Sequence, residues 1–213
     1  MPAPLFETSW ARCWPALGAA GDGVALRDRL LDAYAEPQRH YHTQQHLGEC
    51  LALCERHLAL AEHAAEVEIA LWFHDAVYDV RGRDNEARSA AWARQALQAA
   101  GVGSTVIDRV EALIMVTRHQ ALPQGLDQQL LVDIDLSILG ALRARFQAYE
   151  AQVRAEYAWV PRWVFRRKRR EVLREFLARA PIYSRPELRD EFEAQARDNL
   201  AHSIRQLAFW KLF

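Results

Sequence analysis

The stretch LDQQLLVDIDLSILGALRARFQAYEAQVRAEYAW, residues 126–159, contains no proline and a single glycine, Gly140. Its first half is apolar and predicts a buried helix, with a break near Gly140 because glycine weakens a helix interior. Its second half mixes apolar and polar residues at helical spacing, which predicts a long amphipathic helix closed by Pro161. Nothing in it alternates at period two as a strand would, so the stretch predicts a helical protein.

The remainder of the chain carries the same preference. Strong helix formers dominate nearly every segment, and there is neither an Asn-Gly hairpin signal nor a glycine-rich phosphate loop. Further helices are predicted over residues 24–35, 43–58, 64–78, 85–100, 104–119, 162–179 and 186–209, with Ser104 as an N-cap. We therefore expect an all-α fold, a compact helical bundle that forms one domain over residues 1–213.

Charge and cysteine content narrow the classes of function. The formal net charge is −1 and the sequence pI is about 6.7, which gives no case for nucleic acid or an anionic membrane surface as a partner. Three cysteines and no secretory signal predict a reducing, cytoplasmic environment rather than a disulfide framework. No apolar run reaches about 18 residues, so a membrane-spanning helix is not expected.

The segment ALWFHDAVYD, residues 70–79, places His74 and Asp75 at the end of an apolar helix. A neutral imidazole and a carboxylate are both good ligands for a divalent ion. A buried carboxylate without a cation or hydrogen-bond partners would be costly. Taken alone, the pair also fits a hydrogen-bonded buried histidine followed by a polar residue at a helix end.

Two other segments offer similar groups. RHYHTQQHL, residues 39–47, contains His42 and His46, which share a face if the helix includes both. LLVDIDLSIL, residues 130–139, places Asp133 and Asp135 in an apolar run, where acids are rarely left unpaired. Ordinary histidines at a helix start and an N-capping Asp133 are the plainer alternatives.

Read together, His46, His74, Asp75 and Asp135 are two imidazoles and two carboxylates on three predicted helices. This mixed nitrogen and oxygen set suits Mn²⁺, Fe²⁺, Co²⁺, Ni²⁺, Zn²⁺ or Mg²⁺. Asp133 is the reserve choice for the last ligand, because the helix register around it is open.

The ordered pattern H…HD…D resembles that of the HD superfamily of metal-dependent phosphohydrolases. The words YHTQQHL, WFHDAVYD, DNEARSA and DIDLSILG further resemble a bacterial subgroup of predicted HD phosphohydrolases, over roughly residues 5–205. The resemblance implies an HD-type helical bundle in which His46, His74, Asp75 and Asp135 hold a divalent metal ion. It also implies hydrolysis of a phosphate ester by metal-activated water.

The YHxxxH shape is similar to that of cyclic-nucleotide phosphodiesterases, which share the HD core. This likeness implies that His42 is the general acid, a task that suits an imidazole titrating near neutral pH. We place His42, Asp75 and Glu86 among the candidate catalytic residues. Glu86 follows the start of the helix predicted from residue 85, where it could orient a water or bind a second metal ion.

The candidate substrate-binding residues are Asn85, His119 and Arg170. The amides at the start of the helix at Asn85 could hold a phosphate, and a simple N-cap at Asp84 is the alternative of equal weight. His119 could reach the site from the helix over 104–119, or be an exposed histidine favoured by the helix dipole. Arg170 could bind a substrate phosphate.

Two further patterns are set aside. His46, Cys50, Cys54 and His57 span about three helical turns, too far for all four to meet at one zinc ion. We therefore expect Cys50 and Cys54 to be small core residues. The basic run RRKRR, residues 166–170, has acidic neighbours and is better explained as a solvated helix face than as a nucleic-acid site.

The sequence thus predicts a metal-dependent phosphohydrolase acting on a small phosphorylated substrate, with nucleotides among the candidates. One alternative is an HD-type di-iron oxygenase, which Glu86 or His119 as extra ligands would favour. The other is a catalytically silent, metal-containing binding module. The sequence leaves open the substrate, the metal and the oligomeric state.

Overall fold

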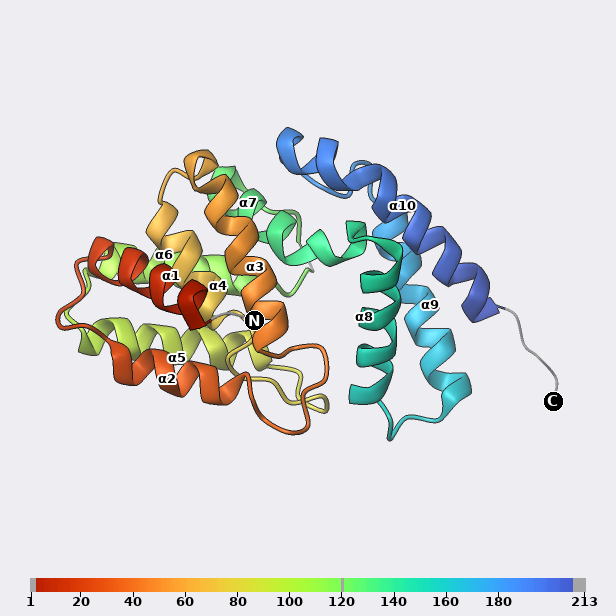
Figure 1. Ribbon diagram of the computed structural model, residues 1–213, viewed down its shortest axis with the longest axis horizontal. Helices are drawn as coiled ribbons and strands as arrows, with labels where there is room; N and C mark the ends of the chain where they lie inside the picture. Colours follow the sequence, from red (N-terminus) through yellow and green to blue (C-terminus); the bar gives the residue numbers. More distant parts are fainter. Residues whose placement is uncertain (1–2, 120, 209–213) are drawn as a thin grey trace. The chain divides into compact units, whose positions relative to one another are not determined.

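The computed structural model describes residues 3–119 and 121–208, which form ten α-helices, two short 3-10 helices and no strand (Figure 1). The all-α fold class is therefore confirmed for these residues. The chain divides into two compact units, residues 1–135 and 136–213. A single domain over the whole chain stays a prediction. None of the helices in the described residues combines the length and the apolar character needed to cross a membrane.

Within its described residues, 3–119 and 121–135, the first unit holds seven α-helices and one 3-10 helix. They are α1 (Ala3–Ala16), α2 (Val24–Ala33), α3 (Gln44–His57), η1 (Leu58–Leu60), α4 (Ala64–Phe73), α5 (Asn85–Ala99), α6 (Ser104–Val116) and α7 (Gly125–Asp135). Helix α4 packs against α1, α3, α5, α6 and α7, so it is the central helix of this unit. Every residue from Glu66 to Phe73 is buried, which is the pattern of a helix covered on all sides.

Two glutamates lie inside this central helix, and each has a basic partner. Arg109 of α6 donates to both carboxylate oxygens of Glu66, at 2.7 and 2.6 Å. Arg12 of α1 donates to both oxygens of Glu68, at 3.0 and 2.5 Å, and Ser9 Oγ donates to Glu68 Oε1 at 2.6 Å. Because both charges are compensated, the helix can be buried and can place its C-terminal end inside the unit.

The second unit contains η2 (Leu136–Gly140), α8 (Arg143–Glu156), α9 (Arg162–Ala178) and α10 (Pro186–Ala208). Helix α10 packs along α9 and against η2. At the contact with η2, a Cβ on Gly140 would lie 2.6 Å from Phe192 Cβ and 2.7 Å from its carbonyl oxygen. Glycine is therefore required at this close approach, at the position where the sequence predicts a helix break.

The structure corrects several predicted helix boundaries. Helix α4 ends at Phe73, whereas the prediction continued it to residue 78. Helix α6 has Gly103 rather than Ser104 as its N-cap, because the Gly103 carbonyl accepts from the amides of Val106 and Ile107. Helix α1 was not predicted at all. The predicted end of the last helix, Phe209, lies outside the described residues.

Candidate metal centre

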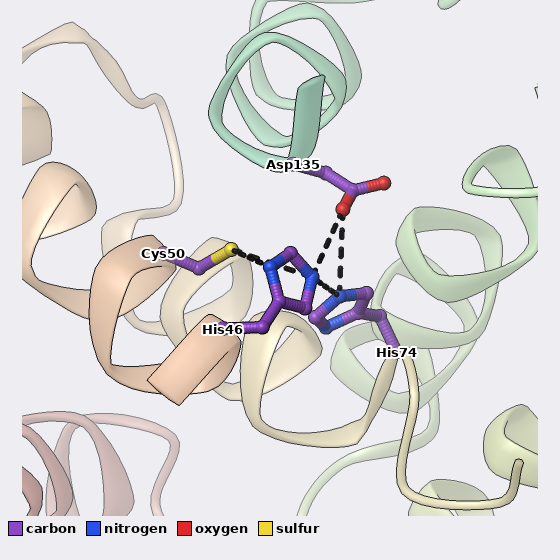
Figure 2. Close-up of side chains that lie close together, drawn as sticks. All are labelled: His46, Cys50, His74 and Asp135. Atoms are coloured by element: carbon purple, nitrogen blue, oxygen red, sulfur yellow. Dashed lines mark hydrogen bonds and ion pairs between the residues drawn. The ribbon is translucent and has the colours of Figure 1, made fainter. Parts of the chain in front are cut away.

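Three helices of the first unit bring a buried group of His46, Cys50, His74 and Asp135 together, and this group could hold a metal ion (Figure 2). His46 lies in the first turn of α3, which Thr43 caps by accepting the amide of Gln45. His74 is the C-cap of α4, and Asp135 is the last residue of α7. The end of the central helix therefore sets the position of the site.

The ligand atoms of His46, His74, Asp75 and Asp135 lie close together. His46 Nε2 is 3.2 Å from His74 Nε2, 3.5 Å from Asp75 Oδ2 and 3.3 Å from Asp135 Oδ1. His74 Nε2 is 3.1 Å from Asp75 Oδ2 and 3.6 Å from Asp135 Oδ1. Figure 2 shows the Asp135 carboxylate pointing at both imidazole rings.

These separations fit the chemistry of a divalent ion. Nitrogen and oxygen ligands lie about 2.0–2.2 Å from zinc, so two ligand atoms on one ion are about 3.0 Å apart at a right angle and about 3.4 Å apart at the tetrahedral angle. The five separations above, from 3.1 to 3.6 Å, lie near these values. The donor atoms are thus spaced as ligands of one ion.

Each imidazole is fixed through its other ring nitrogen. His74 Nδ1 lies 2.7 Å from the carbonyl oxygen of Leu71, and because a carbonyl only accepts, Nδ1 carries the proton. His46 Nδ1 lies 3.1 Å from Tyr41 Oη. The His46 tautomer that suits a metal donates from Nδ1 to this hydroxyl. In both neutral rings the Nε2 lone pair then faces the cluster, as in other histidine–metal sites.

The thiol of Cys50 has a different position from the other donors. Its sulfur is 3.7 Å from Nδ1 and 3.8 Å from Nε2 of His46. If the sulfur lay in the plane of the imidazole at these equal distances, it would collide with the ring carbon between the two nitrogens. We therefore infer that the sulfur lies out of the ring plane. In this position the sulfur packs on the His46 ring, and Cys50 stays one of the four residues of the group that could hold an ion.

The charges of the site favour a cation at its centre. Burial lowers the pKa of His74, but Asp75, Tyr34 and Asp135 raise it well above its ordinary value. Burial likewise lowers the pKa of His46, and Cys50, Tyr41 and the two carboxylates raise it well above the usual range. Burial raises the pKa of Asp75, but His74, His42 and His46 hold it well below the usual range. The ionised carboxylates thus attract protons onto the imidazoles, and a divalent ion can take the place of those protons.

Asp135, rather than Asp133, belongs to the cluster. Burial raises the pKa of Asp135, whereas His119, His46 and His74 hold it well below its ordinary value. His119 Nε2 lies 3.0 Å from Asp135 Oδ2, whereas His46 and His74 lie near the other carboxylate oxygen, Oδ1. His119 has a φ of 55°, a conformation that non-glycine residues adopt rarely. Asp133 is fully buried elsewhere in α7.

The remaining candidates have separate places in the structure. The His42 ring stacks on Tyr78 at 3.9 Å between centroids and lies 6.1 Å from the His46 ring. Glu86 Oε2 is 3.7 Å from Nε of Arg118. Asn85 bonds to the backbone of the preceding loop, accepting the Asp79 amide and donating to the Asp79 carbonyl. Arg170 belongs to α9 in the second unit. The functional roles of these four residues stay predictions.

The sequence motifs alone assign no role to Tyr41 or Cys50 at the site. Cys50 was set aside with a four-residue pattern, yet its spacing of four residues from His46 places both on one helix face. Tyr41 was quoted in the YHxxxH motif, but only the fold shows that its hydroxyl reaches back to His46 Nδ1.

Comparisons of the chain with protein-family models, curated proteins and solved structures each found no match. Membership of the HD superfamily therefore rests on the sequence motifs and stays a prediction.

Proposed function

We propose that the protein is a metal-dependent phosphohydrolase that hydrolyses a small phosphate ester. The observation that carries this proposal is the convergence of two imidazole nitrogens and two carboxylate oxygens from α3, α7 and the end of α4. Neither a packed core nor a surface ion pair requires two Nε2 atoms 3.2 Å apart beside two acids. A bound cation would account for the position of all four groups.

His46, His74, Asp75 and Asp135 are the residues that would hold the ion. A divalent ion supplies Lewis acidity there, which polarises a phosphoryl group and acidifies water. The two imidazoles are buried, with exposed fractions of 2% and 1%, and the carboxylates are partly open, at 18% and 13% of their side chains. In this proposal the partly open carboxylates mark the side from which a substrate would enter.

His42 is the proton donor for the leaving oxygen in this proposal. Its ring stacks on Tyr78, which limits its rotation, and it is close enough to Asp75 to lower the pKa of that carboxylate. An imidazole held beside the site but separate from the four ligands can give a proton to an alkoxide as the phosphate ester bond breaks.

A di-iron oxygenase is the second candidate, because one specific contact favours it. His119 Nε2 touches the second oxygen of Asp135, so an additional imidazole is available next to the cluster. A second iron ion would need further ligands, and His119 could supply one of them. The two functions differ in their products, which makes them separable by experiment.

The test combines elemental analysis of the purified protein with a panel of phosphoesters that includes mononucleotides, cyclic nucleotides and pyrophosphate. We expect a bound divalent ion and hydrolysis of at least one substrate. His42→Ala should keep the metal and lose turnover by about 10²–10⁴-fold. His40→Ala, a change of the exposed histidine two positions earlier, is the matched control and should keep both. Iron-specific loading with oxygen uptake and no hydrolysis would replace the proposal with the oxygenase, and no metal under any loading condition would refute both.

A further inference from the structure

Arg39 is a buried arginine beside the candidate metal centre, and its side chain is only 1% exposed. It lies in the loop between α2 and α3, close in sequence to His42. A buried guanidinium needs partners for its five N–H groups, because unpaired donors inside a protein are costly. The partners of Arg39 therefore indicate what holds it there.

Three of these partners are backbone carbonyls from two of the segments at the site, the loop with His42 and the turn with Asp75. Arg39 Nη1 donates to the Asp75 carbonyl at 2.6 Å and to the His42 carbonyl at 3.3 Å. Its Nη2 donates to the Ala76 carbonyl at 2.9 Å. Its Nε pairs with Glu36 Oε2 at 2.9 Å. One side chain thus joins the turn that carries Asp75 to the loop that carries His42.

Two aromatic rings complete the arrangement. The guanidinium carbon lies 5.3 Å from the centroid of the Tyr34 ring and 5.7 Å from that of Tyr78. Tyr34 Oη accepts the backbone N–H of Asp75 at 3.2 Å, so this residue is held at both its amide and its carbonyl. Tyr78 is the ring on which His42 stacks. Both rings that flank Arg39 therefore reach a site residue themselves.

We propose that Arg39 is the positioning residue of this site, which fixes the metal-binding Asp75 and the proton donor His42 in one mutual geometry. It touches neither ion nor substrate and acts through the backbone of both segments. The part that concerns His42 rests on the proposed function, whereas the part that concerns Asp75 requires only a metal ion.

The arrangement specifies arginine rather than a basic residue in general. The planar guanidinium donates to three carbonyls and a carboxylate at once, while its carbon lies over the rings of Tyr34 and Tyr78. A lysine keeps the charge but offers one nitrogen with three N–H groups, so it cannot replace all four contacts that Arg39 makes through three nitrogens. Arg39→Lys is therefore the informative variant.

Metal affinity is the first measurement, made by calorimetry with Zn²⁺ on metal-free protein. Loss of a group that orients a ligand typically costs 10–100-fold in metal affinity, and we expect about that for Arg39→Lys. Arg29→Lys is the matched control, because Arg29 also lies over an aromatic ring, Trp92 at 5.5 Å, but is exposed. It should bind Zn²⁺ as the wild type does. Equal affinities for the two variants would overturn the proposal.

Turnover is the second measurement, made with saturating metal so that weaker binding no longer limits the rate. Arg39→Lys should still show a lower kcat, because the His42 loop is no longer held, while a purely structural role would leave kcat unchanged once the folded site is full. If the wild type hydrolyses nothing, the proposed function fails, but the Zn²⁺ affinities still decide the role of Arg39 toward Asp75.

A measurement on the wild type covers the case in which Arg39→Lys does not fold. The Nε–H resonances of Arg39 and Arg29 can be followed by NMR as Zn²⁺ is added. We expect the Arg39 resonance to shift with metal occupancy and the Arg29 resonance to stay in place. An Arg39 resonance that ignores the metal would overturn the proposal without any variant.

Discussion

Replacing His74 with alanine should abolish tight metal binding, whereas replacing Cys50 with alanine should barely change it. His74 Nε2 lies within 3.1–3.6 Å of three other donor atoms, so its removal takes away a quarter of the ligand set. Cys50 Sγ lies at nearly equal distances, 3.7 and 3.8 Å, from the two ring nitrogens of His46, so we expect it to pack on the ring rather than to bind the ion. The two variants truncate neighbouring buried side chains, which makes each the control of the other.

The expected magnitudes follow from these positions. Loss of a direct ligand should exceed the 10–100-fold typical of an outer group, so His74→Ala should weaken binding more than about 100-fold, or about 2.8 kcal/mol. Cys50→Ala should change affinity by less than about threefold, or about 0.6 kcal/mol. Circular dichroism of both metal-free variants checks that the helices are retained.

Thermal unfolding with and without metal gives an independent assay. At a free metal concentration of about 100 times Kd, binding stabilises the folded state by about 2.7 kcal/mol. For a chain of this size that corresponds to a Tm rise of about 5–10 °C. The rise should persist in Cys50→Ala and vanish in His74→Ala. Equal losses in the two variants would make the sulfur a ligand, and a full rise in His74→Ala would refute the metal centre.

Three further predictions concern stability. Arg12→Met should lower the free energy of unfolding in urea by about 3–5 kcal/mol, because it leaves the Glu68 carboxylate, 1% exposed, without its cation. The double variant with Glu68→Gln should regain most of this stability, and a double variant as unstable as Arg12→Met would contradict the prediction. Gly140→Ala should destabilise the second unit by about 1–3 kcal/mol, since its Cβ would collide with Phe192, and an unchanged denaturation midpoint would refute this. Burial raises the pKa of the Cys54 thiol, so above about pH 8.5 this thiol loses its proton only in the unfolded state. The free energy of unfolding should therefore decrease as the pH rises above this value, and it should decrease less in Cys54→Ala.

The fold class could be read from the sequence because helix formers and apolar spacing agree over most of the chain. Two elements show where local patterns fail. The apolar pattern suggests that α4 continues past His74, but the backbone turns there because Arg39 and Tyr34 bind the Asp75 peptide groups. Helix α1 begins at Ala3 and includes Pro15, and its burial of Trp10 against Trp72 comes from tertiary packing that no local signal reveals.

The candidate site divides in a similar way. Metal-ligand chemistry singles out histidines and aspartates in apolar helices, and these four do converge in the structure. The choice of Asp135 over Asp133 needed the register of α7, which a uniformly apolar run leaves open. Contacts with the backbone, such as that of Arg39 with the Asp75 carbonyl, depend on the fold and not on a motif in the sequence, so they could not be predicted.

Asp135 is the last residue of the first unit, about ninety positions after His46. An ion held by both would act as a removable cross-link over a long segment of chain. In a chain-entropy view, a permanent link closing a loop of about 100 residues restricts the unfolded ensemble by about 4.7 kcal/mol. During synthesis, a chain of which only α1 to α4 have left the ribosome has the two histidines but not Asp135, so its site is incomplete. The ion can be captured in full only after α7 has emerged, so metal capture would report that the whole first unit has assembled.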